Sequence, residues 1–148
     1  MGTVLYLDLD TIITGPLEPV VRVDTAFAAL RDFYRPQGLG SGVVLWNGDH
    51  SEIWRQWKKF GKPILPGGDQ EWLEYARGRC DRLQDLLPGR IHSYNAPVTL
   101  QIAPPGCSII CCHGEPRPHQ INGWVKELYW HERNEPARAL REEVRASN

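Results

Sequence analysis

Residues 4–10, VLYLDLD, place two aspartates one residue apart at the end of an apolar run. Apart from Asp8, positions 4–9 hold β-branched, aromatic or leucine side chains, which predicts a β-strand buried on both faces. Successive strand residues alternate sides, so Asp8 and Asp10 should point the same way. Two adjacent carboxylates repel each other unless they are protonated or bind a cation. The alternative is a pair of solvated aspartates in a turn.

The composition indicates one globular domain: 148 residues, of which 41% are hydrophobic and 24% are charged. Seventeen Lys and Arg against eighteen Asp and Glu give a formal net charge of −1, which argues against a nucleic-acid partner. No apolar stretch approaches the roughly 20 residues that span a bilayer, and the early aspartates do not fit a secretory signal. We therefore expect a soluble, cytoplasmic protein without a transmembrane segment.

The rest of the chain predicts alternating helices and strands. Helices are expected at residues 26–34, 50–60, 69–83 and 123–130, and strands at 43–47, 86–95 and 107–112. Asp24 or Thr25 should cap the first of these helices. The charged residues 135–148 predict a surface helix that frays into a tail. The pattern therefore predicts an α/β domain over residues 1–134, with a small mixed sheet flanked by helices.

The four cysteines, Cys80, Cys107, Cys111 and Cys112, include no C-x-x-C pair. Three of them lie in CSIICC, which is typical of a buried strand in which cysteine packs as a small hydrophobic residue. Cys111 and Cys112 should point to opposite faces of that strand, which disfavours a shared metal. Reduced core thiols are the simpler interpretation, and a zinc site is the alternative.

A second polar group follows the CSIICC strand. In residues 109–121, IICCHGEPRPHQI, His113 is followed by a Gly/Pro-rich loop that carries Arg117 and His119. A neutral imidazole can bind a metal, and a planar guanidinium can clamp a phosphate. Combined with the two aspartates, this loop would supply the third ligand and the cation that a metal-bound diphosphate needs. The alternative is a hydrogen-bonded surface loop.

Five motifs in one order resemble the second half of bacterial and phage glycosyltransferases of the GT-A fold. The motifs are D-x-D, SGVVLWN, GGDQEWLE, LPGRIHSYN and PPGCSIICCHGEPRP, and the similarity runs from Thr3 to Trp130. The nearest members are those of the glycogenin and lipopolysaccharide galactosyltransferase group. The resemblance implies sugar transfer from a nucleotide-sugar donor to an acceptor that the sequence does not identify, with Mn²⁺ or Mg²⁺ holding the diphosphate.

The same resemblance assigns the metal and diphosphate residues. Asp8 and Asp10 fall on the D-x-D motif, and His113 falls on the metal-binding histidine of the family. Arg117 falls on the basic residue that touches the diphosphate, and Gly114 belongs to the same substrate-binding loop.

Four further positions match the segments around the donor sugar. Ser41 and Gly42 fall on the segment that lines the donor site, and Asp69 and Gln70 fall on the D-Q pair near the donor sugar and acceptor, which implies a catalytic role. For Asp69, the alternative is that it merely caps the helix that follows it.

Members of this group normally carry a further N-terminal half that holds the base and ribose, whereas this sequence begins on the D-x-D strand. Three alternatives follow. Another chain supplies this surface, the donor is held by its diphosphate and sugar alone, or catalysis is lost. The uncovered strand also predicts a homodimer, with apolar side chains at the interface. These are Val4, Tyr6, Ile12 and Ile13.

Two other functions stay open. LYLDLDTII matches the first motif of haloacid dehalogenase-like phosphatases, in which Asp8 would be the nucleophile and Asp10 the general acid, with Mg²⁺. The other is a non-catalytic binding protein, whose partner surface would use some of the six tryptophans. These are Trp46, Trp54, Trp57, Trp72, Trp124 and Trp130.

Overall fold

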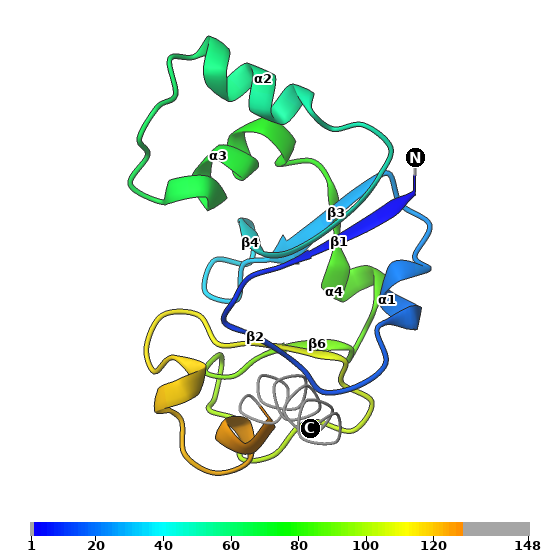
Figure 1. Cartoon of the computed structure of the whole chain (residues 1–148), viewed down its shortest axis with the longest axis vertical. Helices are drawn as coiled ribbons and strands as arrows, with labels where there is room; N and C mark the ends of the chain where they lie inside the picture. Colours follow the sequence, from blue (N-terminus) through cyan, green and yellow to red (C-terminus); the bar gives the residue numbers. More distant parts are fainter. Residues whose placement is uncertain (1, 129–148) are drawn as a thin grey trace, which may run out of the picture.

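The computed structural model describes residues 2–128, which form two small mixed β-sheets with helices around them (Figure 1). The first sheet has the strand order β1 (Thr3–Leu7), β4 (Leu39–Asn47), β3 (Phe27–Arg31), β5 (Asp81–Arg82). The second has the order β2 (Thr11–Ile13), β7 (Ile109–Cys111), β6 (Ile91–Ser93). The predicted α/β class is confirmed, although the strands are divided between two sheets instead of forming one.

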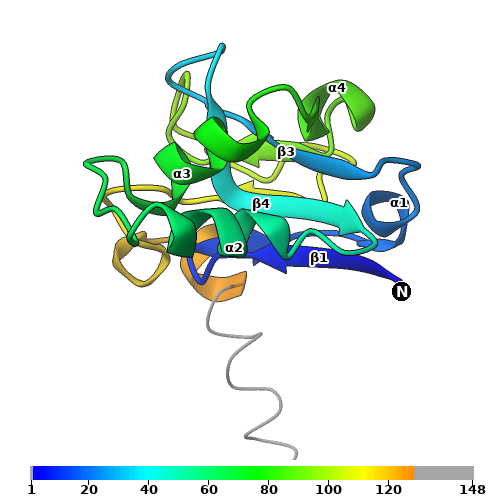
Figure 2. The same ribbon diagram turned by 90° about the horizontal axis from the view of Figure 1, so that it is seen from above.

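The helices flank the two sheets. They are α1 (Glu18–Val21), α2 (Glu52–Lys59), α3 (Gly68–Arg77), α4 (Leu83–Leu86) and the 3₁₀-helix η1 (Pro118–Gln120), and residues 124–128 are also helical. Helices α1 and α4 contribute Val20 and Leu83 to the core between the sheets. Helices α2 and α3 cover the face of the first sheet that points away from the second sheet (Figures 1 and 2). Among residues 2–128, no helix has the length and apolar character needed to cross a lipid bilayer.

Strand alternation divides the core into three layers. Ala28 and Val43 point from the first sheet toward Ile109 of the second, whereas Ala29 and Val44 point the other way, toward α2 and α3. The third layer lies beneath the second sheet, away from the first, and is built around Ile12, Ile110, Cys112, Ile121 and Val125. Both sheets are therefore buried on two faces near their centres, which fixes the strand ends that carry the polar residues.

Strand β1 differs from its prediction, because it lies at an edge of the first sheet and is not buried on both faces. Among residues 2–128, it pairs only with β4, in an antiparallel register. Val4 and Tyr6 are each more than 40% exposed, whereas Leu5 and Leu7 pack against the core between the sheets. Ile12, predicted to share an exposed surface with them, is instead fully buried in the second sheet.

The prediction of a helix at residues 26–34 was wrong. Residues Phe27–Arg31 form β3, an interior strand of the first sheet, between β4 and β5. Four consecutive residues of this strand are buried, because the two faces of the sheet are covered by different layers. Alanine favours helices, but burial on two faces requires a continuous apolar run, which this segment supplies.

The predicted strands at 43–47, 86–95 and 107–112 and the helix at 50–60 are confirmed, with shifted ends. Helix α3 ends at Arg77, earlier than predicted, and β5 and α4 follow it. Cys107, Cys111 and Cys112 are buried free thiols, as expected, and Cys111 and Cys112 belong to different core layers. The predicted tail at 135–148 lies outside the described residues.

Candidate functional site

A tight turn carries the two aspartates from the first sheet to the second. The backbone amide of Asp8 donates to the carbonyl of Gly42 in β4 (2.9 Å), and the carbonyl of Asp8 accepts from the amide and hydroxyl of Thr11. The carbonyl of Asp10 accepts from the amide of Cys112, just beyond β7 (2.9 Å). Backbone bonds to both sheets therefore fix the positions of Asp8 and Asp10.

Six of the nine sequence-predicted site residues line one pocket of about 310 Å³, which we call the polar pocket. They are Asp8, Asp10, Ser41, Gly42, Gln70 and His113. The elements that bring them together are the turn after β1, the strand β4, the first turn of α3 and the loop after β7. Residues separated by more than one hundred positions thus share one cavity.

His113 lines the polar pocket and is partly buried. Its Nε2 is 2.8 Å from the hydroxyl of Ser93, and its ring packs against the rings of Phe33 and Tyr34, with centroids 5.1 and 5.7 Å away. Burial lowers the pKa of His113, and the nearby carboxylates of Asp10 and Asp32 only partly oppose this shift. The imidazole is therefore neutral at pH 7, the form that binds metals.

Asp10 is held between a like charge and an opposite one. Burial raises the pKa of Asp10, and the charge of Asp8 raises it further, whereas Arg117 and His113 lower it. Arg117 Nη1 lies 2.7 Å from Asp10 Oδ2. Gly114, with a φ of 73°, makes the turn that leads from His113 to this arginine. The predicted diphosphate-binding residue therefore contacts the D-x-D motif directly.

Asp8 accepts a short hydrogen bond from Tyr6, two residues earlier on the same side of β1. The Tyr6 hydroxyl lies 2.6 Å from Asp8 Oδ1. This bond, with partial burial and the negative charge of Asp8, raises the pKa of Tyr6 to about 12. The hydroxyl therefore keeps its proton at neutral pH and can only donate to the carboxylate.

The sequence analysis missed Asp32, a third carboxylate of the polar pocket. Burial would raise its pKa, but hydrogen bonds from the amides of Tyr34 and Arg35 and from the Arg35 side chain outweigh burial and lower it. Asp32 Oδ2 also accepts from Gln70 Nε2 at 2.9 Å. Asp32 therefore fixes the loop after β3 and orients a predicted catalytic side chain.

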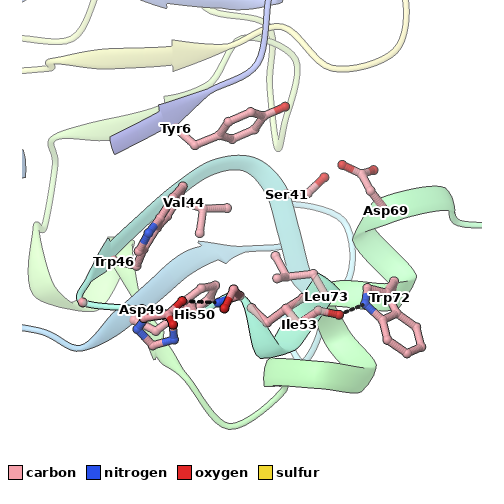
Figure 3. A pocket seen from close by; sticks show the side chains of 13 residues that line it. Tyr6, Ser41, Val44, Trp46, Asp49, His50, Ile53, Asp69, Trp72 and Leu73 are labelled. Carbon is pink, nitrogen blue, oxygen red and sulfur yellow. Dashed lines mark hydrogen bonds between the residues drawn. The ribbon is translucent and has the colours of Figure 1, made fainter. Parts of the chain in front are cut away.

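Asp69 opens onto a second cavity, the apolar cavity, of about 440 Å³ between the first sheet and helices α2 and α3. Figure 3 shows Asp69 and Ser41 close together at one end of it, with Trp46 and His50 at the other. Ser41 also lines the polar pocket, so the two cavities adjoin. The N-cap of α3 is Gly67, and Asp69 lies in the first turn, so the helix-cap alternative for Asp69 is wrong.

The donor types in the polar pocket fit a divalent cation, because two neighbouring carboxylates and a neutral imidazole are ligands that such ions accept. Among residues 2–128, however, no three His, Cys, Asp or Glu side chains lie close enough together to hold a metal ion as they stand. Arg117 and Tyr6 already occupy one oxygen each of Asp10 and Asp8. These residues therefore have the right donor atoms for a divalent cation, but their side chains do not form a preformed ligand cage.

The arrangement is that of part of the GT-A glycosyltransferase fold, as the sequence resemblance predicted. The glycosyltransferase GlyE of Streptococcus pneumoniae TIGR4 in its apo form is 22% identical and superposes with a TM-score of 0.62 over 88% of this chain and 39% of that one. The galactosyltransferase LgtC in complex with donor and acceptor sugar analogues is 17% identical, with a TM-score of 0.57 over 88% of this chain and 61% of that one.

The active-site mutant Q189E of LgtC gives a similar result, with 16% identity and a TM-score of 0.59. No family model and no curated protein sequence matches this chain. By these superpositions, the chain spans about two fifths of the length of GlyE and about three fifths of that of LgtC. At these identities the likeness establishes the fold.

Proposed function

We propose that this chain provides the catalytic metal and diphosphate site of a glycosyltransferase that uses a nucleotide-sugar donor. The observation that carries the proposal is the convergence of six predicted residues on the polar pocket, within a fold that resembles glycosyltransferases. Asp8, Asp10 and His113 would hold Mn²⁺ or Mg²⁺. The bound cation would act as a Lewis acid on the phosphate oxygens of the donor.

Arg117 would supply a second positive charge for the leaving diphosphate. Departure of a nucleoside diphosphate develops negative charge on phosphate oxygens, and a fixed guanidinium stabilises that charge. Arg117 is half exposed and already lies at the rim of the site through its ion pair with Asp10. A cation bound to Asp10 would compete with Arg117 for that carboxylate and leave the guanidinium free to bind the donor.

Gln70 and Asp69 would act on the sugar and the acceptor. Gln70 faces the polar pocket and is held by Asp32, whereas Asp69 faces the apolar cavity next to Ser41. The junction between the two cavities is therefore where we place the transferred sugar. The donor would lie on the polar side and the acceptor on the side of Asp69.

Calorimetry with Mn²⁺ and Asp10→Ala tests the metal site. We expect Mn²⁺ binding by the wild type and none by the variant, because the Asp10 side chain is only 20% exposed and lies near His113. The exposed residue Asp24, outside both cavities, provides the matched control Asp24→Ala. Full-strength binding by Asp10→Ala would overturn the metal assignment.

A turnover assay tests the reaction class. The protein should release nucleoside diphosphate from one of a panel of UDP-sugars and GDP-sugars, and Arg117→Ala should lower that rate by roughly 100-fold, by analogy with the removal of an oxyanion donor. The aryl phosphate p-nitrophenyl phosphate should stay intact. Its hydrolysis by the wild type and not by Asp8→Asn would instead show the phosphatase with Asp8 as nucleophile.

The partner that covers β1 is a separate question. Val4 and Tyr6 are exposed on β1, whose outer edge is paired with no other strand of the described residues, so self-association through β1 stays a prediction. Light scattering over a concentration series, with the charged substitution Val4→Lys, tests it. A protein that stays monomeric at high micromolar concentration would contradict a homodimer.

A further inference from the structure

Helix α2 and the loop after it expose an unusual amount of apolar surface. Trp54 is 55% exposed, Phe60 57% and Ile64 fully exposed, and α2 contributes no buried residue to the core. In Figure 1, α2 lies at the outer side of the molecule, beyond α3. Three large apolar side chains therefore face solvent within one short segment.

The same segment is basic. Residues 52–62 contain four basic side chains, all exposed, and one acidic side chain, Glu52, which is paired with Arg77 of α3. The segment therefore carries a formal charge of +3 in a chain whose net charge is −1. The basic residues are Arg55, Lys58, Lys59 and Lys62. Within the described part of the chain, none of the three lysines forms a salt bridge.

Local contacts hold the aromatic and basic groups side by side. Trp54 stacks on Trp57, with ring centroids 4.6 Å apart, and Lys58 Nζ lies 5.7 Å from the centroid of the Trp54 ring. Trp57 Nε1 donates to the carbonyl of Pro63 (3.3 Å), which ties the loop with Ile64 back to the helix. The helix and its loop thus form one continuous surface, which we call the basic-aromatic surface.

We propose that the basic-aromatic surface docks this protein on an anionic lipid membrane. Amphipathic helices that lie in the membrane interface combine Trp, Phe or Leu with Lys or Arg, and α2 and its loop carry both kinds of residue on one exposed surface. Lysine and arginine near the surface are attracted to anionic headgroups, and tryptophan prefers the headgroup region. The rest of the chain is net negative and is repelled by anionic lipid, so the molecule would turn the basic-aromatic surface toward the membrane.

Docking would also bring a groove to the membrane. A cavity of about 500 Å³ between α2 and α3 extends from Trp54 and Ile64 to Asp69. An acceptor held at the lipid surface would reach Asp69 along this groove, a step that rests on the proposed function. The docking itself requires no transferase activity, so the two proposals can fail separately.

Co-sedimentation with vesicles tests the docking. The protein should bind vesicles of phosphatidylglycerol and phosphatidylcholine and bind pure phosphatidylcholine vesicles much more weakly, and added salt should weaken binding to the anionic vesicles. The double variant Lys58→Glu/Lys59→Glu should bind the anionic vesicles at least roughly 30-fold more weakly, the effect of losing two lysines, because the new carboxylates are also repelled. The double variant Arg22→Glu/Lys126→Glu is a matched control, because both positions are exposed, lie outside α2 and its loop, and give the same change in charge.

Trp54→Ala adds a test that does not depend on charge, and circular dichroism shows whether each variant folds. We expect Trp54→Ala to weaken vesicle binding and leave the far-UV spectrum unchanged. Equal binding to neutral and anionic vesicles would overturn the proposal. So would an equal loss of vesicle binding in Lys58→Glu/Lys59→Glu and in its control. An absence of binding to anionic vesicles would overturn it as well. If α2 variants then changed the oligomeric state, this surface would be identified as a contact between copies of the chain.

Discussion

The polar pocket and the α2–α3 layer lie on the same sheet, yet they are built in opposite ways. Asp32 and His113 of the pocket follow β3 and β7, strands that are buried on both faces, and backbone bonds to both sheets hold the turn of Asp8 and Asp10. Helices α2 and α3 contain no buried residue and cover the sheet with partly exposed aromatic side chains. A substitution should therefore be costly near the pocket and cheap on the outer helices.

The largest expected effect is on the core that supports the pocket. Ile109 is fully buried between the two sheets, in the central strand of the second sheet. Ile109→Ala should lower the free energy of unfolding by about 2–5 kcal/mol, because it removes buried surface and leaves a cavity. Urea unfolding measures this. The control Ile64→Ala, at a fully exposed position, should change it by less than about 0.5 kcal/mol. Similar losses in both variants would contradict the comparison.

The second effect concerns the carboxylate that organises the pocket. Asp32→Asn should lower the free energy of unfolding by about 1–3 kcal/mol at pH 7, because the charge-assisted bond to Arg35 is lost. The folded-state pKa of Asp32 is lowered, so its contribution is present above the unfolded pKa of about 3.9 and is lost as pH falls through the folded value.

The difference between wild type and Asp32→Asn should therefore shrink when urea unfolding is repeated at about pH 3. The matched control is Asp24→Asn, which alters an exposed carboxylate outside the pocket. A difference that grows on acidification would show that the charge of Asp32 does not stabilise the fold.

The strand ends explain why much of the site could be predicted and Asp32 could not. Asp8 and Asp10 follow an apolar run that contains Val4, Leu5 and Leu7, and His113 follows CSIICC, so each was expected at a strand end. Asp32 follows FAALR in the same manner, but the two alanines made that run look helical. The missed signal was an apolar run that ends in an aspartate, as in LYLDLD.

The exposure of β1 could not be predicted from its residues. A run such as VLYL has the same composition at a sheet centre and at an edge, and only the pairing of the other strands decides which of the two it occupies. Leu5 and Leu7 point to the face that packs on the core between the sheets, whereas Val4 and Tyr6 point to the opposite face and stay more than 40% exposed at this edge of the sheet.

A smaller effect is expected at Tyr6, which links the exposed edge to the pocket. Its pKa of about 12 predicts one tyrosine that stays protonated near pH 11, and Tyr6→Phe should remove that late step from an ultraviolet absorbance titration. A raised folded pKa means that the contribution to stability is complete below about pH 10 and is lost as pH rises toward 12. Because Tyr6 is 43% exposed, the substitution should cost less than about 1 kcal/mol.

The titration has a clear contrary outcome. If all tyrosines of the wild type ionise together near pH 10, the hydroxyl of Tyr6 does not donate to Asp8 in solution. The control Tyr75→Phe alters an exposed tyrosine of α3 that makes no hydrogen bond with Asp8, and it should leave the late step in place.

The smallest effect tests the outer helices with two lysines that differ by one position. Lys58 lies over the Trp54 ring, whereas among residues 2–128 no cation–π contact involves its neighbour Lys59. Both are exposed, so Lys58→Gln and Lys59→Gln remove the same charge from the same helix and leave similar helix propensity. Lys58→Gln should cost about 0.5 kcal/mol, since 5.7 Å is near the outer limit of a cation–π contact, and Lys59→Gln should cost less. Urea unfolding followed by tryptophan fluorescence measures both.

Equal costs would show that the ring beneath Lys58 contributes nothing to stability. A loss at Lys58 comparable to that of Ile109→Ala would show that α2 is as firmly integrated as the strands. On the same pair, vesicle binding should fall to a similar degree in both variants, because long-range attraction to anionic headgroups depends on the charge that is lost and not on the ring beneath it.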